Sequence, residues 1–272
     1  MGRWGRKGFG ATSPDAAYDT AIAAGQAGDF RKALRTIAQA EELFVARGDV
    51  DARAGAARSA WRAANYHAAV RAPDDAIEAG RRAVDAWTAV VAETGNQAWN
   101  RELVRACADV SVFAVMAGHH DEAVTLASRA VEIARTAKDK GLDMSRDLQT
   151  ELGTALHNLA AAHSSRAVAR GSSTDPRSPT DPRSQTDLQA ALRAADDEVR
   201  LRRTLAGSGP DLAAWELASG LCQRGRIRMV AGELQSARYD LVEARGLATR
   251  LGPAGQTLLA EATAALHHLG PA

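Results

Sequence analysis

A turn followed by two alanines seven residues apart recurs along this chain of 272 residues. It is clearest at Gly118, where the turn leads into a segment with Ala123 and Ala130. Three further turns are followed by equally spaced alanine pairs, at Ala33 and Ala40, Ala76 and Ala83, and Ala237 and Ala244. Residues seven apart lie on one face of an α-helix, and alanines there let two helices pack closely. The pattern predicts a series of helix hairpins in which each packs on its neighbours.

The composition favours helices with a core of small residues. Hydrophobic residues make up 46% of the chain and aromatic residues only 4%, so the core must consist mainly of alanine, leucine and valine. Alanine has the highest helix propensity of all residues. The eight prolines, which interrupt helices, lie almost wholly between the periodic segments. The predicted fold class is therefore all-α.

The balance of charge argues against two classes of partner. The chain has 34 basic and 33 acidic residues, so it has no excess of positive charge to attract nucleic acid or an anionic membrane. No run approaches the roughly 18 apolar residues of a membrane span, and the N-terminus lacks the apolar core of a signal peptide. Cys107 and Cys222 lie in separate predicted helices, which fits a reducing compartment. We expect a cytoplasmic protein.

Turn residues divide the chain into five hairpins and a last helix. The expected helix pairs are 14–27 with 30–46, 51–70 with 74–93, 98–117 with 120–138, 145–169 with 187–206, and 211–231 with 234–250, followed by a capping helix at 254–268. Residues 13–270 are expected to form a single solenoid domain after a disordered tail at 1–12. Residues 171–185 contain two near copies of Thr-Asp-Pro-Arg-Ser and are expected to be a disordered loop in the fourth hairpin.

The hairpins resemble the tetratricopeptide repeat (TPR) family. Gly28, Phe30, Ala33 and Ala40 match the turn and the alanine spacing that open that family's second helix. The first alanine of each pair lies at position 33, 76, 123, 191 or 237. The spacing between successive first alanines exceeds the family's standard repeat of 34 residues. Longer repeats are similar to kinesin-light-chain-like repeats and to arrays attached to actinobacterial regulators, which the segment 198–206 also resembles. The resemblance implies a right-handed α-solenoid of antiparallel helix hairpins.

The same resemblance implies a binding surface. In the family, the first helix of each repeat lines a concave groove. The matching positions in this chain are Tyr18, Ile22, Gln26, Arg58, Trp61, Asn65, Arg105, Val112, Met116, Thr154, His157 and Arg226. This mixture of aromatic, apolar and arginine side chains suits a peptide with apolar anchors and some negative charge. Trp61 and Asp109 stand where chaperone-binding relatives have a Lys and an Asn, so the carboxylate clamp of those relatives is absent.

Two function classes remain open at this point. The first is a non-catalytic scaffold that holds a peptide or helix of a partner protein in the groove. The second is a sensory module whose groove takes a small ligand or a signalling peptide. For any single position there is a simpler interpretation, in which Arg58 and Arg105 solvate the inner wall and Trp61 belongs to the core.

Chemistry-bearing residues do not form a recognisable enzyme, cofactor or metal motif. The adjacent residues His119 and His120 diverge by about 100° on a helix, so we interpret them as a solvated turn rather than as shared metal ligands. Residues 196–198, Asp-Asp-Glu, are interpreted as a solvated face. Cys107 and Cys222 are expected to be small core residues. The protein is therefore not expected to be an enzyme.

The sharpest basic cluster lies at 224–228, Arg-Gly-Arg-Ile-Arg, with Arg200, Arg202 and Arg203 in the preceding helix. It could hold a phosphate or an acidic peptide. Arginines at alternate positions spread around a helix, however, and Glu198 and Glu216 are near enough in sequence to neutralise them. We therefore favour a solvated role for this cluster.

Overall fold

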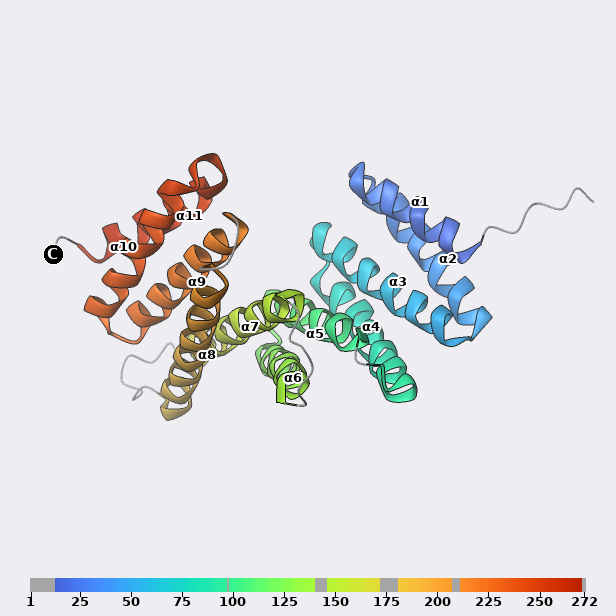
Figure 1. The fold of residues 1–272 in the computed structure, drawn as a ribbon, viewed down its shortest axis with the longest axis horizontal. Coiled ribbons are helices and arrows are strands. Elements are labelled where there is room, and N and C mark those ends of the chain that lie inside the picture. Colours follow the sequence, from blue (N-terminus) through green and yellow to red (C-terminus); the bar gives the residue numbers. More distant parts are fainter. Residues whose placement is uncertain (1–12, 97, 140–145, 172–180, 207–210, 271–272) are drawn as a thin grey trace, which may run out of the picture. The chain divides into compact units, whose positions relative to one another are not determined.

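The computed structural model describes residues 13–96, 98–139, 146–171, 181–206 and 211–270. Within these ranges the chain contains eleven α-helices and one short 3₁₀ helix, η1 (Figure 1). The elements are α1 (Pro14–Gln26), α2 (Phe30–Arg47), α3 (Val50–Ala69), α4 (Pro73–Thr94), α5 (Ala98–Met116), α6 (His120–Asp139), α7 (Arg146–Gly171), α8 (Pro182–Ala206), α9 (Asp211–Val230), α10 (Leu234–Arg250), η1 (Gly252–Gly255) and α11 (Gln256–His268). The predicted all-α class is confirmed. The expected tail at 1–12 lies outside the described residues.

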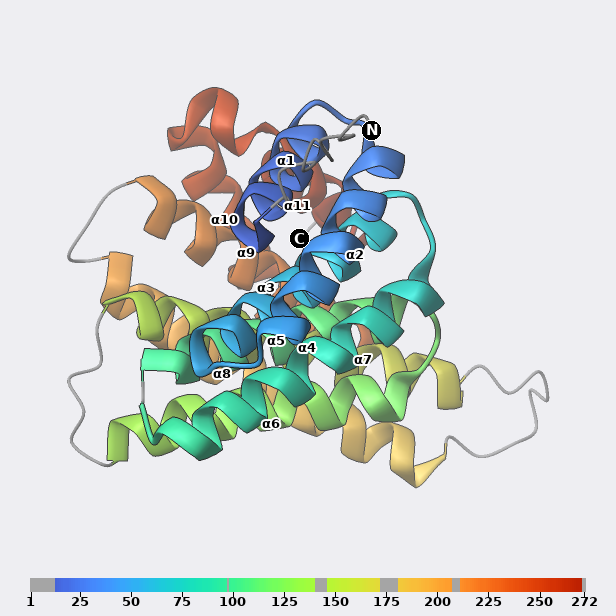
Figure 2. The same ribbon diagram turned by 90° about the vertical axis from the view of Figure 1, so that its right-hand side faces the viewer.

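The chain divides into two compact units, residues 1–106 and 107–272. The single solenoid domain over 13–270 stays a prediction. In the first unit, α1 to α4 each pack on the next helix along the chain. In the second unit, the same neighbour-to-neighbour packing runs from α6 to α11, and α7 packs most extensively on α8 (Figure 1 and Figure 2). Such nearest-neighbour packing is what a chain of helix hairpins requires.

Four turns within hairpins share one hydrogen-bonding pattern. In each, a backbone N–H beyond the helix donates to the carbonyl five residues earlier, as the Schellman motif requires. The bonds are Asp29 to Ala24 at 3.0 Å, Ala72 to His67 at 2.9 Å, His119 to Ala114 at 2.8 Å and Glu233 to Arg228 at 2.8 Å. The motif needs a left-handed residue, which is glycine in three turns and Arg71, with φ of 61°, in the other. The turns predicted from Gly28, Gly118 and Gly232 are therefore confirmed.

The repeated alanines form the contacts between helices. The first alanine of every predicted repeat is fully buried, and so is the second wherever an alanine occupies that position: Ala33, Ala40, Ala76, Ala83, Ala123, Ala130, Ala191, Ala237 and Ala244 each have 0% exposure. The last helix, α11, buries Leu258 and Ala262 and leaves Glu261 exposed, as expected for a cap. The repeat register read from the sequence is therefore correct.

The fourth hairpin corrects one predicted boundary. Helix α8 begins at Pro182, so residues 182–185, which the sequence assigned to the disordered loop, form its first turn. Ser184 is buried there, and its hydroxyl donates to the carbonyl of Ala167 on α7 at 2.8 Å. The near copies of Thr-Asp-Pro-Arg-Ser concealed this start, because the second copy supplies Asp181 and Pro182 as a helix cap and first residue. Residues 172–180 lie outside the described residues.

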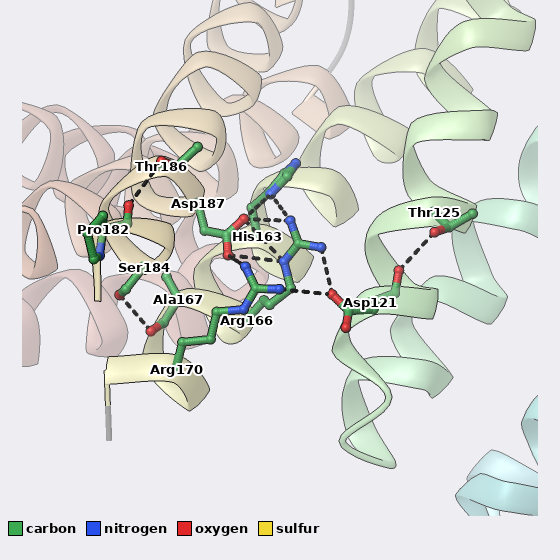
Figure 3. A network of polar contacts seen from close by, with 10 residues as sticks. All are labelled: Asp121, Thr125, His163, Arg166, Ala167, Arg170, Pro182, Ser184, Thr186 and Asp187. Atoms are coloured by element: carbon green, nitrogen blue, oxygen red, sulfur yellow. Dashed lines mark hydrogen bonds and ion pairs between the residues drawn. The ribbon is translucent and has the colours of Figure 1, made fainter. Parts of the chain in front are cut away.

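A buried carboxylate joins α7 to α8 at the same end of the hairpin (Figure 3). Asp187 on α8 accepts hydrogen bonds from Arg166 and from Arg170, the latter at 2.7 Å, and lies 3.2 Å from Nδ1 of His163. Both arginines also reach Asp121 on α6, at 2.8 and 3.2 Å. This network ties three consecutive helices together.

Candidate functional site

Three hollows follow one another along α9 in the second unit. The first, of about 220 Å³, is lined by Thr154, His157, Glu198, Arg202, Trp215, Glu216 and Ser219. The second, of about 530 Å³, shares His157, Trp215 and Ser219 with the first and is completed by residues of α7, α9 and α11. The third, of about 410 Å³, shares Arg226, Val230 and Glu261 with the second. We call this series the α9 groove.

The α9 groove presents apolar side chains to solvent. Trp215 is 39% exposed at one end, and Val230 is 54% exposed at the other. The fifteen residue steps from Trp215 to Val230 correspond to about 22 Å of helix at roughly 1.5 Å per residue. Ile227 and Leu258 contribute further apolar surface to the middle hollow. A groove of this length and character can hold several residues of an extended chain or a short helix.

A buried acid lies at the Trp215 end of the groove. Glu198 on α8 is 1% exposed, and its Oε1 lies 3.1 Å from Nδ1 of His157 on α7. Its Oε2 is buried and has no hydrogen-bond partner among the described residues. Burying an unpaired carboxylate oxygen is costly. This residue therefore requires an explanation beyond packing.

The interpretation of residues 196–198 as a solvated face is wrong for Glu198. The sequence contained a signal that would have identified it: Glu198 follows Ala191 by seven residues, the place held by Ala40, Ala83, Ala130 and Ala244 in the other repeats. A carboxylate there needs more room than a methyl group. Gly220 on α9 provides that room, because a Cβ at Gly220 would lie 2.9 Å from Oε1 of Glu198. A glycine on one helix thus accommodates an acid on the next.

Arg202, one helical turn after Glu198, has a similar setting. It is 4% exposed and lies against Gly153 of α7, where a Cβ would come within 2.6 Å of its guanidinium carbon. Its Nη1 pairs with Glu216 at 2.6 Å, and its Nη2 lies 3.4 Å from the hydroxyl of Thr154. Arg202 and Glu216 therefore neutralise each other inside the first hollow.

Several solved structures share this architecture. Nearly identical TPR-like repeats of a kinesin-light-chain sequence from Podosopora anserina superpose with a TM-score of 0.59 at 16% identity, over 88% of this chain and 96% of that one. BtubC (BKLC) from P. vanneervenii gives 0.62 at 16% identity, over 88% and 81%. The apo form of RapI gives 0.62 at 9% identity, over 94% of this chain and 64% of that one. The chain has a TPR-like fold.

No model of a known protein family matches the chain, and no curated protein matches it. The similarity between this chain and the solved structures therefore concerns the helical repeats and their order. The site must be argued from the side chains of this chain alone.

The second unit of this TPR-like chain brings three of the predicted groove residues together. Thr154 and His157 line the first hollow, and His157 and Arg226 line the second. They come from α7 and α9, which are first helices of their hairpins, as the resemblance implied. Val112 and Met116 are exposed on α5, at 38% and 56%, and line none of these three hollows.

The first unit places the other predicted residues on α1, α3 and the start of α5. Trp61 is half-buried, and the guanidinium groups of Arg62 and Arg105 lie 4.7 and 5.2 Å from the centre of its ring. Such cation–π contacts fix the ring and reduce its freedom to meet a partner. The remaining members of this set are Tyr18, which packs on the core beside Phe44, half-buried Ile22 and Asn65, and exposed Gln26 and Arg58.

The interpretation of the basic cluster at 224–228 as solvated is wrong for Arg224 and Arg228, whereas Arg226 is exposed as expected. Arg224 is buried and pairs with Asp240 at 2.6 Å and Asp196 at 2.9 Å. Arg228 pairs with Asp240 at 2.7 Å, and exposed Arg226 pairs with Glu261 at 3.2 Å. Each arginine already faces a carboxylate, because α10 and α11 supply acids that the local sequence does not reveal.

Both cysteines of the chain are buried thiols. Burial raises the pKa of Cys107 and of Cys222 to about 11, so both thiols stay protonated and unreactive near neutral pH. Cys222 lines the middle hollow as a buried thiol that is protonated near neutral pH.

Within the described ranges, no group of three His, Cys, Asp or Glu side chains could hold a metal ion. Among the helices described, none is long and apolar enough to cross a membrane.

Proposed function

We propose that this protein is a non-catalytic interaction module that binds a peptide or helix of a partner protein along the α9 groove. The observation that carries the proposal is the row of three adjoining hollows, with Trp215 and Val230 exposed at its two ends. Exposed aromatic side chains beside a groove are the groups that most often dominate binding energy between proteins. The TPR-like fold supports this use, since α7 and α9, the first helices of their hairpins, both contribute residues to the groove.

The charges along the groove favour a partner with apolar anchors rather than a strongly acidic one. Arg226 and Arg202 lie in the groove, but each already pairs with a carboxylate. An acidic peptide would have to displace Glu261 or Glu216. The hydroxyl groups of Ser164, Ser165 and Thr257 line the middle hollow and suit polar backbone groups of a bound chain.

A small ligand or signalling peptide is the second candidate. The middle hollow, at about 530 Å³, lies within the roughly 300 to 1,000 Å³ typical of small-molecule sites. In that case the chain would be a sensory module. We propose a cytoplasmic location for either role, and the unbonded, buried cysteines support a reducing compartment.

The test begins with a partner recovered by pull-down and titrated as a purified protein. Trp215→Ala should weaken binding at least tenfold, about 1.4 kcal/mol, because its exposed indole lines both the first and the second hollow. Tyr239→Ala is a matched control, since Tyr239 is a 68% exposed aromatic residue on α10 that lines none of the three hollows. It should change affinity less than twofold.

A second pair of variants separates the two units. The double variant Trp61→Ala with Arg105→Ala removes the predicted surface of the first unit and should leave affinity within threefold. If that double variant abolishes binding while Trp215→Ala does not, the α9 groove is the wrong surface. Circular dichroism must confirm that every variant is folded. A small molecule that competes with the partner and loses affinity in Trp215→Ala would instead support the sensory role.

A further inference from the structure

We infer that the first hollow of the α9 groove is a specificity pocket for a lysine or arginine side chain of the bound peptide, with Glu198 as its counter-ion. This inference rests on the proposed function and names the chemistry that the partner must present. The observation behind it is that Glu198 lines that hollow and that its buried Oε2 has no hydrogen-bond partner among the described residues. The partner's basic group would donate to this oxygen.

Two buried polar atoms of residues that line the first hollow have no hydrogen-bond partner among the described residues: Oε2 of Glu198 and Nε of Arg202. Arg202 and Glu216, the other ion pair of the hollow, face each other at 2.6 Å. His157 can satisfy only Oε1 of Glu198, at 3.1 Å. Oε2 therefore lacks a donor within the part of the chain that the structure describes. A carboxylate in this state is best matched by a charged donor, because charge-assisted hydrogen bonds are stronger than neutral ones.

Two features of the sequence show that this position is adapted to a glutamate. Glu198 replaces the alanine that every other repeat has at this position, and Gly220 on α9 leaves the space that the carboxylate fills. Packing alone would be better served by alanine, which all four equivalent helices bury completely. A charged side chain that is costly to bury and has room made for it is characteristic of a binding site.

The size and the walls of the hollow suit one long side chain. At about 220 Å³ it is smaller than typical small-molecule sites. Trp215 lines it and is 39% exposed, so its ring can cover the aliphatic stem of a lysine or arginine and attract the cation. The hydroxyl groups of Thr154 and Ser219 lie in the same lining. Residues on one side of the basic residue would then occupy the middle hollow and the mostly apolar third hollow toward Val230.

The test uses random ten-residue peptides displayed on phage and selected on the full chain. Selected peptides should carry Lys or Arg at one position, with apolar residues within about seven positions, because the groove spans about 22 Å and an extended chain rises roughly 3.3 Å per residue. The best peptide is then synthesised with an acetylated N-terminus, alongside a copy in which norleucine replaces the basic residue. Norleucine keeps an apolar stem and removes the charge.

The norleucine peptide should bind the wild-type protein at least tenfold more weakly. With Glu198→Gln the original peptide should lose a similar factor, and the two peptides should then differ by less than threefold. The wild-type comparison needs no protein variant, so it decides the matter even if Glu198→Gln does not fold. Equal binding of both peptides to wild type, selection of acidic peptides, or loss of binding on acetylation alone would each overturn the inference.

The outcomes separate this inference from the proposed function. If both peptides bind wild type equally and Trp215→Ala still abolishes binding, the groove binds peptides and the basic specificity is wrong. If no peptide is selected at all, the peptide-binding function and the basic pocket are both overturned.

Discussion

Arg166 on α7 holds Asp187 on α8 with its Nε 3.1 Å from each carboxylate oxygen (Figure 3). Burial alone would raise the pKa of Asp187, but hydrogen bonds from Arg166 and His163, together with the charges of Arg166 and Arg170, outweigh it and lower the pKa. The same hydrogen bonds, which Arg166 donates to Asp187, raise the pKa of Arg166. The carboxylate is thus charged in the folded protein and clamps the fourth hairpin.

Replacing this acid should destabilise the second unit at neutral pH. Asp187→Asn would leave Arg166 and Arg170 without their buried counter-ion, at a cost of about 2 to 3 kcal/mol. We place it below the usual range for broken buried pairs because Asp121 can still pair with both arginines. Chemical denaturation at pH 7 measures the difference. An unchanged unfolding free energy would contradict the clamp.

The effect of Asp187 should disappear in acid. Because its folded pKa lies below its ordinary value of 3.8, its contribution to stability is complete above that pH and is lost as pH falls through the folded pKa. His163 also has a lowered pKa, caused first by burial. The folded protein therefore loses stability as the pH falls below 6.5, the ordinary pKa of histidine. Measuring the effect of Asp187→Asn in a His163→Gln background removes that second titration. The gap in unfolding free energy between the two proteins should stay constant from pH 7 to about pH 4.5 and narrow below.

Two glycines near the C-terminal cap should respond oppositely to alanine. At Gly255 a Cβ would lie 2.1 Å from the backbone oxygen of Ala248, which cannot move without shifting α10, whereas at Gly246 it would meet nothing within 4 Å. Gly255→Ala should therefore cost about 1 to 3 kcal/mol. Gly246→Ala should gain about 0.5 to 1 kcal/mol from helix propensity. Thermal unfolding of the two variants would refute this packing if both changed in the same direction.

The connection between α7 and α8 should tolerate shortening only up to a defined point. Replacing residues 172–180 with Gly-Asn should leave the thermal midpoint within about 3 °C, since closure entropy depends weakly on loop length. Extending the replacement through Gln185 should lower it further, because it removes the first turn of α8 and the bond from Ser184 to Ala167. Ser184→Ala, which deletes only that buried bond, should cost about 1 kcal/mol. Equal midpoints for the short and long replacements would contradict the helix start at Pro182.

The buried alanines should not accept larger side chains. Ala123 has 0% exposure between packed helices, so Ala123→Leu should cost about 1 to 3 kcal/mol by overpacking. Ala260→Leu on the exposed side of α11 is the control and should be nearly neutral. A normal unfolding curve for Ala123→Leu would mean that the helices there are more loosely packed than the structure has them.

Some groove residues could be predicted from the sequence, whereas others reach the groove only through contacts between helices. Thr154, His157 and Arg226 were predicted from the resemblance to the TPR family, which assigns groove positions to the first helix of each repeat. Glu198 and Arg202 were missed, since both come from a second helix, and they reach the hollow only because Gly220 and Gly153 leave space on neighbouring helices. Arg224 and Arg228 were misjudged for the same reason, since the acids that pair with them come from α8 and α10.

The sequence by itself determined the helices, their turns and the buried face of each, because helix periodicity, turn glycines and alanine spacing act over fewer than ten residues and repeat five times. Only the tertiary structure decided which charged side chains are buried and which lie in the groove. Those outcomes depend on contacts between residues such as Arg202 and Thr154, 48 positions apart, whose energies no local pattern encodes. Burial removes a carboxylate from water, and it can be recognised only from the positions of the surrounding helices.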